Sequence, residues 1–185
     1  MGAADNITPA DVLAFWREAG PDRWFAPDRA FDDEVRGRFL DLWWAAAGGQ
    51  LNSWQVSDDG TLALAIVLDQ FPRNMFRQEP SAYATDAAAR RLALDAIERG
   101  VDLRIDPALR QFLYMPLMHS ENLADQERCI EQFRKAGNAE NLKYAEHHAD
   151  IIRRFGRFPH RNQVLGRTTT ADEQDFLDGD RSWAG

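Results

Sequence analysis

The chain has 185 residues, a formal net charge of −8 and one cysteine, Cys129. A chain of this length buries roughly two-thirds of the surface that its unfolded form exposes, so its core can stabilise it without disulfides. A single cysteine excludes an intramolecular disulfide and an all-cysteine metal site, and we expect Cys129 to be an inert helical residue. The acidic balance opposes nonspecific nucleic-acid binding, which requires lysine and arginine to neutralise phosphates.

The N-terminal stretch MGAADNITPADVL has neither a basic region nor a long apolar run. Nowhere in the chain do about 18 consecutive apolar residues occur, the length that a membrane-spanning helix needs. The sequence therefore predicts a soluble, unexported protein of the cytoplasm that does not associate with membranes.

Helix signals dominate the N-terminal half of the chain. Thr8 is a candidate N-cap before Pro9, and Gly20-Pro21 ends the helix that begins there. The run TLALAIVLDQF is apolar almost all round, which predicts a helix in the centre of the core. Further helices are predicted around residues 32–47 and 82–99. Residues on the expected core-facing stripes are Val12, Phe15, Trp16, Ala19, Val35, Phe39, Leu42, Trp43, Ala46, Ala89, Leu92, Ala93, Ala96 and Ile97.

The C-terminal half continues this pattern. Asp106-Pro107 opens another helix, which we expect Pro116 to break or kink. Two helices are predicted near 121–136 and 139–155, each ending before a glycine. A last short helix begins at TADE, where Thr170 and Glu173 fit a capping box.

No alternating strand pattern, linker or fixed-period repeat divides the chain. The sequence predicts an all-α protein of about seven or eight helices that pack as antiparallel neighbours. We expect a single helical domain over 1–185, with an ordered core from about 8 to 178 and a C-terminal tail over 179–185.

Three stretches carry a resemblance to a known family: LDQFPRN, FLYMPLMHSENLADQ and HADIIRRFGRFPHRNQVLGRTTTADEQDFL. They resemble the bacterial domain-of-unknown-function family 924, and the likeness runs from VLAFW to DFL. Met115 and Leu117 depart from the Leu and Phe expected there. The resemblance implies antiparallel helix pairs in a tetratricopeptide-like right-handed superhelix, and it implies no activity. The usual tetratricopeptide spacing of Trp, Leu, Gly and Tyr is absent, so this architecture rests on the resemblance alone.

Phe-Pro is followed twice by an Arg-Asn pair, the second time with His160 between them. Proline removes a backbone donor and restrains the preceding residue, so each Phe-Pro is predicted to mark a helix boundary with its phenyl ring packed inward. Arg73 and Asn74 would then stand on a braced turn, as would Arg161 and Asn162. Arginine offers a planar fork to carboxylate or phosphate, and asparagine can orient a ligand. In the alternative interpretation both pairs only tie helix ends together.

Two charge patterns add to this prediction. Asp69 precedes Arg73 by four residues, the helical spacing of an ion pair, which could belong to a site or form a rigid brace. No acidic residue occurs between Asp150 and Asp172, a segment that contains Arg153, Arg154, Arg157, Arg161 and Arg167. This cationic island suits a small anion better than a polymer, although it could simply be a solvated basic face.

The histidines supply the remaining candidates. His119 precedes Ser120, an expected N-cap, and Glu121 is predicted in the first helical turn, where donors and the helix dipole favour anions. In the alternative, this is a capping segment with an incidental histidine. His148 falls on the apolar stripe of its helix and could be a site residue or a hydrogen-bonded core residue.

A metal site is weakly supported. His147 is turned roughly 100° away from His148 on the same helix, so the adjacent pair is a poor chelate. A zinc or iron site assembled from His119, Glu121, His148 and His160 is chemically conceivable, but no HExxH-like spacing favours it. We predict neither a metal nor a cofactor.

The sequence thus predicts one concave polar site in which the two Phe-Pro motifs approach each other. The site is lined by Arg73, Asn74, His119, Glu121, His148, His160, Arg161 and Asn162, with Asp69 in support. The leading interpretation is binding of a small anionic molecule or of the acidic terminus of a peptide.

Two alternatives stay open at this point. One is an enzyme with His119 or His160 as general acid or base beside Glu121, and with Arg73 or Arg161 stabilising negative charge. The other is a structural module, with a homodimer as one form of it. The chain has no G-x-S-x-G elbow, phosphate-cradling glycine loop or dinucleotide fingerprint, which disfavours nucleophile and nucleotide enzymes.

Overall fold

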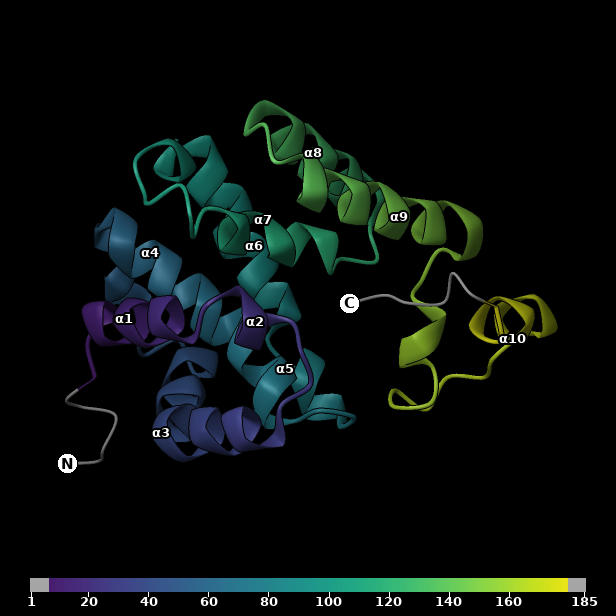
Figure 1. Ribbon diagram of the computed structural model, residues 1–185, viewed down its shortest axis with the longest axis horizontal. Helices are drawn as coiled ribbons and strands as arrows, with labels where there is room; N and C mark the ends of the chain where they lie inside the picture. Colours follow the sequence, from purple (N-terminus) through teal and green to yellow (C-terminus); the bar gives the residue numbers. More distant parts are fainter. Residues whose placement is uncertain (1–6, 180–185) are drawn as a thin grey trace. The chain divides into compact units, whose positions relative to one another are not determined.

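The computed structural model describes residues 7–179 (Figure 1). Within this range every regular element is helical and no strand occurs, which confirms the all-α prediction. The chain divides into two compact units, Met1–Pro116 and Leu117–Gly185, hereafter unit 1 and unit 2. A single-domain organisation and a superhelical arrangement stay predictions. Apart from Gly179, the predicted C-terminal tail lies outside the described residues.

Unit 1 is built around a buried central helical run. Its helices are α1 (Pro9–Ala19), α2 (Pro21–Trp24), α3 (Arg29–Ala47), α4 (Asp58–Ala65), α5 (Phe71–Met75), α6 (Asp86–Glu98) and the start of α7 (Gln111–Met118). Helix α1 packs on α4, and α3 packs on α5. The shorter turns are η2 (Asn52–Val56), η4 (Pro80–Tyr83) and η5 (Val101–Leu103). The predicted stripes of α1, α3 and α6 are buried, except that Ala19 is only partly buried, and Leu13 and Phe31 are buried in addition.

Helix α1 begins where its sequence predicts. The Thr8 hydroxyl accepts a hydrogen bond from the Asp11 backbone N–H at 3.3 Å, and the Asp11 carboxylate accepts one from the Thr8 N–H at 2.8 Å. This reciprocal capping box gives the Thr8 N–H a partner and adds a second acceptor to the Asp11 N–H, which also donates to the Thr8 carbonyl oxygen at 3.1 Å.

The central run joins α4 to α5 through a π-helical segment, η3 (Ile66–Gln70), which the sequence did not predict. Pro72 has no N–H to offer the carbonyl of Leu68, so the normal helical bond cannot form there. The Leu68 carbonyl instead accepts from Thr85 Oγ1 at 2.5 Å, and the Phe71 N–H donates to Ile66 five residues back. A π segment is one of the recognised ways in which a helix accommodates such an interruption.

The first Phe-Pro motif, Phe71-Pro72, lies in this central run. The Phe71 ring is fully buried and lies 4.6 Å from the Phe39 ring between centroids, so its predicted inward packing is confirmed. Arg73, however, lies on α5 rather than on a turn, as does Asn74, because the helical run continues through Pro72. A boundary between η3 and α5 does fall at the first Phe-Pro, since α5 begins at Phe71, but the predicted turn is wrong.

Gly60 in α4 occupies a position that no larger residue fits. A Cβ there would lie 2.7 Å from Ser57 Oγ and would overlap the carbonyl oxygen of Trp54. We expect Gly60→Ala to lower the free energy of unfolding by about 1 to 3 kcal/mol, because the added methyl overpacks rigid backbone. The exposed Gly37 in α3 provides the control, since a Cβ added there would meet no atom within 4 Å. Gly37→Ala should stabilise the protein by about 0.5 to 1 kcal/mol, and equal signs for the two variants in urea unfolding would contradict this account.

Helices α6 and α7 start later than predicted. The end of η4 and a turn over 84–85 occupy the predicted start, so α6 begins at Asp86. Asp106 does accept a hydrogen bond from the Ala108 N–H at 3.0 Å, but regular helix begins only at Gln111. Pro116 lies inside α7, which continues to Met118, so this proline does not end the helix.

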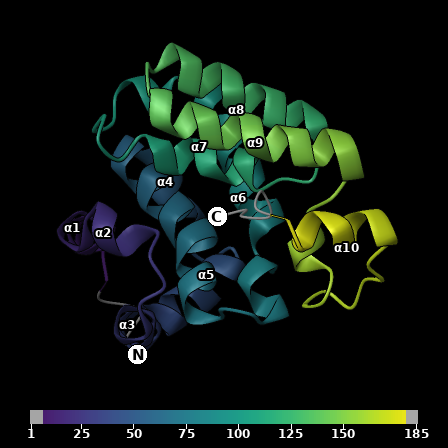
Figure 2. The same ribbon diagram turned by 45° about the vertical axis from the view of Figure 1, so that its right-hand side comes forward.

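Unit 2 contains α8 (Leu123–Lys135), α9 (Ala139–Phe155), the turn η6 (Pro159–Arg161) and α10 (Ala171–Leu177). Figures 1 and 2 show α8 and α9 side by side, and the two helices pack along each other. Gly137 with φ 68° and Gly156 with φ 69° follow the two helices, at the predicted stops. The capping box of Thr170 and Glu173 is present at the start of α10, as predicted.

The start of α8 differs from the prediction. Asn122 is the N-cap, and its Oδ1 accepts from the Ala124 N–H at 2.9 Å. Ser120 accepts from the Asn122 N–H and donates to Asp125 at 2.6 Å. Glu121 thus precedes the helix instead of standing in its first turn. No helix in the described part of the chain is long and apolar enough to cross a membrane.

Candidate functional site

The predicted site residues of unit 1 form a buried charge network. Arg73 Nη1 lies 3.2 Å from the Asp69 carboxylate, so the predicted ion pair forms, and Asp69 is fully buried. Both terminal nitrogens of Arg73 also donate to Asp86, at 2.9 and 3.1 Å. Burial opposes the charge on Arg73, but Asp69 and Asp86 outweigh it and raise the Arg73 pKa. Arg73 therefore connects the π segment with the first residue of α6.

Asn74 and Arg77 bind one carboxylate of α3. The Asn74 Nδ2 donates to Asp32 Oδ1 at 2.8 Å, and Arg77 contacts both Asp32 oxygens at 2.8 and 2.9 Å. These contacts tie α5 to α3 and correspond to the alternative interpretation of the Arg-Asn pair. A ligand-binding role for Asp69, Arg73 and Asn74 stays a prediction.

In unit 2 the ring of Phe158 organises the other predicted residues. This ring is fully buried, so the inward packing predicted for the second Phe-Pro is confirmed. The imidazoles of His148 and His160 each have their centroid 5.5 Å from the centroid of the Phe158 ring. The Arg161 guanidinium carbon lies 4.6 Å from the same centroid. We call His119, His148, Phe158, His160 and Arg161 the histidine cluster.

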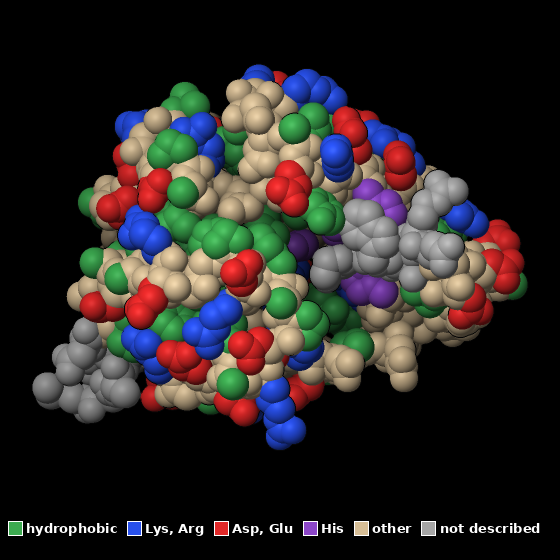
Figure 3. All heavy atoms as spheres, viewed as in Figure 1, with side chains coloured by type: hydrophobic (Ala, Val, Ile, Leu, Met, Phe, Trp, Pro, Cys, Tyr) green, Lys and Arg blue, Asp and Glu red, His purple; other side chains and the backbone are tan. Residues whose placement is uncertain are grey.

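All four histidines of the protein belong to unit 2, and histidine side chains gather in one region of the face drawn in Figure 3. His148 is 3% exposed, which confirms its predicted inward orientation. Its Nδ1 lies 2.8 Å from the Tyr144 carbonyl oxygen. Burial lowers the His148 pKa to about 3 despite that hydrogen bond, and His119, His147 and His160 lower it further. This imidazole is therefore neutral near neutral pH.

His160 is partly exposed at the second Phe-Pro corner. Burial and then the charge of Arg161 lower the His160 pKa to about 4, with Glu121 opposing them and with His119 and Arg167 adding to them. The structure thus brings His119, Glu121, His160 and Arg161 within electrostatic reach of one another. His160 is also neutral near neutral pH, and the charge of Arg161 contributes to this after burial.

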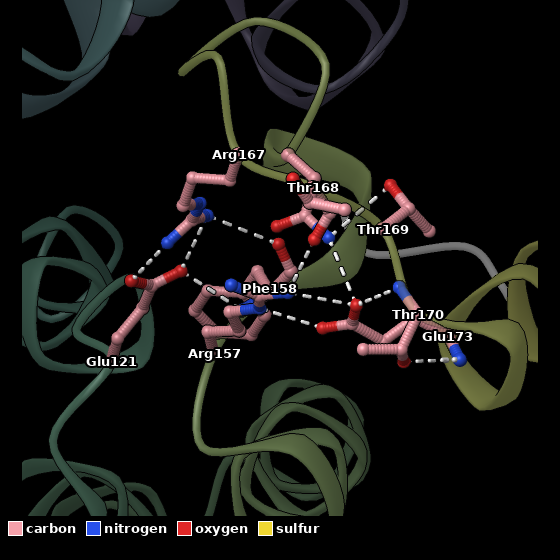
Figure 4. Close-up of polar contacts among 9 residues, drawn as sticks. Glu121, Arg157, Phe158, Arg167, Thr168, Thr169, Thr170 and Glu173 are labelled. Atoms are coloured by element: carbon pink, nitrogen blue, oxygen red, sulfur yellow. Dashed lines mark hydrogen bonds and ion pairs between the residues drawn. The ribbon is translucent and has the colours of Figure 1, made fainter.

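Glu121 forms a brace instead of a free carboxylate beside His119. Arg167 donates to both Glu121 oxygens at 2.8 and 3.0 Å, and the Phe158 backbone N–H donates to Glu121 Oε1 at 2.8 Å (Figure 4). Although burial opposes ionisation, these donors keep the Glu121 pKa below its usual value. Glu121 thereby fixes the backbone at Phe158.

A second brace, which the sequence did not predict, is centred on Glu173 of α10. Arg157 donates to both Glu173 oxygens at 2.6 and 2.8 Å, and the Thr170 N–H donates at 2.8 Å (Figure 4). Asn162 Nδ2 donates to Glu173 as well, at 3.2 Å. Arg157 is the main cause that lowers the Glu173 pKa to about 2, against its burial. The buried Asn162 Oδ1 has no hydrogen-bond partner among the described residues.

The cationic island is mostly paired. Arg153 contacts Asp150 at 2.8 Å, while Arg157 and Arg167 hold the two glutamate braces. Arg154 lies over the Phe155 ring, 4.5 Å from its centroid. The segment is therefore a braced corner rather than a solvated basic face.

Residues 7–179 offer little support for metal binding or for a nucleophilic cysteine. No group of three or more His, Cys, Asp or Glu side chains there is placed to hold a metal ion. Cys129 is buried on α8, and burial raises the pKa of its thiol, which disfavours a nucleophilic thiolate. An open pocket of about 540 Å³ between α9 and α10 is lined by His147, Arg154, Phe155 and Phe176 among others, and by none of the predicted site residues.

The two Phe-Pro corners belong to different compact units, so their predicted approach stays a prediction. Within unit 2, by contrast, His148, His160 and Arg161 do gather, around one buried ring. Sequence reasoning missed Arg167 and Glu173 as partners of this corner. Arg167 belongs to the cationic island and Glu173 to the predicted capping box, so these two patterns already pointed to both residues.

Comparison with known proteins identifies a bacterial family of unknown function. The model of the family DUF924, described as a bacterial protein of unknown function, matches residues 12–180. A solved protein of unknown function from Agrobacterium tumefaciens, ATU0120, is 46% identical, with a TM-score of 0.89 over 92% of this chain and 96% of that chain. No curated protein matches. The chain belongs to the DUF924 family.

Proposed function

We propose that the histidine cluster of unit 2 binds a small anionic molecule or the acidic terminus of a peptide. The observation that supports this most is that the Arg161 guanidinium and the His160 imidazole both lie against the Phe158 ring, 4.6 and 5.5 Å from its centroid. Burial and then the charge of Arg161 lower the pKa of this imidazole to about 4, against the charge of Glu121. The charge of Arg161, which disfavours an imidazolium, favours an anion at the same place, since both effects have the same Coulombic origin.

The two braces support the same proposal. Arg167 and Arg157 are engaged by Glu121 and Glu173, so they hold the corner in place. Arg161 lies against Phe158 beside two neutral imidazoles. A neutral imidazole and a guanidinium can both donate hydrogen bonds to an oxyanion, and such charge-assisted bonds are strong.

A reducing cytoplasm is the compartment that we propose for this activity.

The enzyme alternative is less well supported. A general acid or base works best when its pKa lies near the operating pH. His160, with a pKa of about 4, would be a weak base, and Glu121 is held in an ion pair with Arg167. We therefore place binding before catalysis.

Thermal unfolding in the presence of phosphate or succinate tests the proposed function. Either anion should raise the melting temperature of the wild-type protein, by an amount equivalent to about 2.7 kcal/mol at one hundred times its dissociation constant. Arg161→Met should abolish the shift, because it removes the charge while its stem can still cover Phe158. Arg153→Met is the matched control, since Arg153 is more exposed and paired with Asp150, and it should keep the shift.

Two results would contradict the proposal. One is the absence of a shift in the wild type with any small anion, and the other is an equal shift in the wild type and in Arg161→Met. The unliganded melting temperature of each variant shows whether the substitution has damaged the fold itself.

A further inference from the structure

The hydrogen bond of His148 fixes the tautomer of its ring. The Nδ1 atom lies 2.8 Å from the Tyr144 carbonyl oxygen, and a carbonyl can only accept, so Nδ1 carries the hydrogen. A ring that is neutral has only one such hydrogen. Its Nε2 atom is therefore unprotonated and presents a lone pair that can only accept.

The position of this acceptor is fixed as well. His148 is 3% exposed, and its ring packs edge to face on Phe158 at an interplanar angle of 72°. Because Nδ1 faces the backbone of its own helix, Nε2 lies at the outer edge of the ring, away from that backbone. The ionisable groups that act on the ring are His119, His147 and His160, which are all bases.

The cation, Arg161, and the acceptor, His148 Nε2, thus belong to side chains that contact the same ring. The Arg161 guanidinium carbon lies 4.6 Å from the Phe158 centroid and the His148 ring packs edge to face on it, and both side chains are buried, at 6% and 3% exposed. An anion without a hydrogen atom would bring its own lone pairs toward Nε2, and two acceptors that face each other gain no hydrogen bond and lose hydration. An anion that keeps a hydroxyl hydrogen would instead satisfy Arg161 and Nε2 together.

We propose that the histidine cluster selects oxoanions that carry a hydroxyl hydrogen, with hydrogenphosphate as the simplest member, and that His148 Nε2 accepts this hydrogen while Arg161 binds the charge. This inference rests on the proposed function, because it requires that an anion binds at the cluster. It adds the chemical class of the ligand. Discrimination of this kind is strong when a site contains a buried polar group that the wrong ligand leaves unpaired.

Calorimetric titration with phosphate and with sulfate tests the inference. Above the second pKa of phosphate both anions are tetrahedral and carry two charges, but only phosphate keeps a hydroxyl hydrogen. Wild-type protein should bind phosphate more tightly than sulfate by on the order of tenfold. Equal affinities would overturn the inference and leave the proposed function intact, whereas no binding of either anion would contradict the proposed function itself.

Two substitutions identify the acceptor. His148→Asn places an amide N–H where Nδ1 stands and can keep the bond to Tyr144, but it has no atom at the position of Nε2, so phosphate and sulfate should then bind equally. His148→Gln can place its amide oxygen near the position of Nε2 and should keep part of the preference. A preference that survives unchanged in His148→Asn would overturn the assignment to His148.

The ring nitrogens give a readout that needs no substitution. The ¹⁵N resonances of His148 should show a protonated Nδ1 and an unprotonated Nε2 in the free protein. Phosphate should shift the Nε2 resonance toward the protonated range, and sulfate should not. An Nε2 resonance that responds to neither anion, while phosphate binds, would overturn the inference even if the variants failed to fold.

Discussion

Replacing Arg73 with methionine should lower the free energy of unfolding by about 3 to 5 kcal/mol, because removal of one partner leaves a buried charge uncompensated. The charge in question is Asp69, which is fully buried on the π segment and lies 3.2 Å from Arg73. Asp86 would lose both of its bonds from the same guanidinium. Urea unfolding followed by circular dichroism gives the change, provided that the m-value stays constant.

Arg17→Met is the matched control for this prediction. Arg17 also contacts an aspartate at 3.0 Å, but its side chain is 54% exposed, and exposed ion pairs contribute only about 0.2 to 1 kcal/mol. In the Arg73→Met background, Asp69→Asn should recover part of the loss, since it removes the buried charge that Arg73 had stabilised. If the two arginine variants lose equally little stability, the network around Arg73 is not the brace described above.

Mild acid should destabilise the protein through His148 and His160. Their pKa values in the folded protein are about 3 and about 4, below the ordinary value of 6.5. Between these limits the unfolded chain binds more protons than the folded one, so stability is fully present above pH 6.5 and is lost as the pH falls. Each histidine should contribute a slope of up to about 1.4 kcal/mol per pH unit.

The carboxylates lose their contribution to stability in a different pH range from the histidines. Glu121 and Glu173 have pKa values below the ordinary 4.5, so their contribution is lost only at lower pH. The interval from 6.5 to 4.5 therefore reports mainly the histidines. The double variant His148→Gln, His160→Gln should flatten the slope of unfolding free energy there. An unchanged slope in that variant would show that other groups cause the acid sensitivity.

Local sequence signals predicted much of the fold correctly. The N-cap at Thr8, the capping box at Thr170 and the glycine stops at Gly137 and Gly156 depend only on neighbouring residues, and all four were found as expected. The sequence did not show which of two neighbouring residues is the N-cap of α8. Ser120 and Asn122 are both good N-caps, and the Ser120 hydroxyl instead binds Asp125, which moved the start of α8 beyond Glu121.

The features that the sequence did not predict depend on partners far along the chain. The π segment needs Thr85, which lies 17 residues from Leu68. The brace on Phe158 needs Glu121 and Arg167, which are 46 residues apart. A pattern of spacing carries no information on such pairs. The sequence therefore could not show that arginines of the cationic island are paired with carboxylates.

Titration of the histidine resonances in the presence of phosphate tests the central claim most directly. A bound anion favours the imidazolium form, so saturating phosphate should raise the His160 pKa above about 4 and should shift the guanidinium resonances of Arg161. Arg161→Met should remove both responses. A His160 pKa that stays the same with and without phosphate, with Arg161 resonances also unmoved, would contradict anion binding at the histidine cluster.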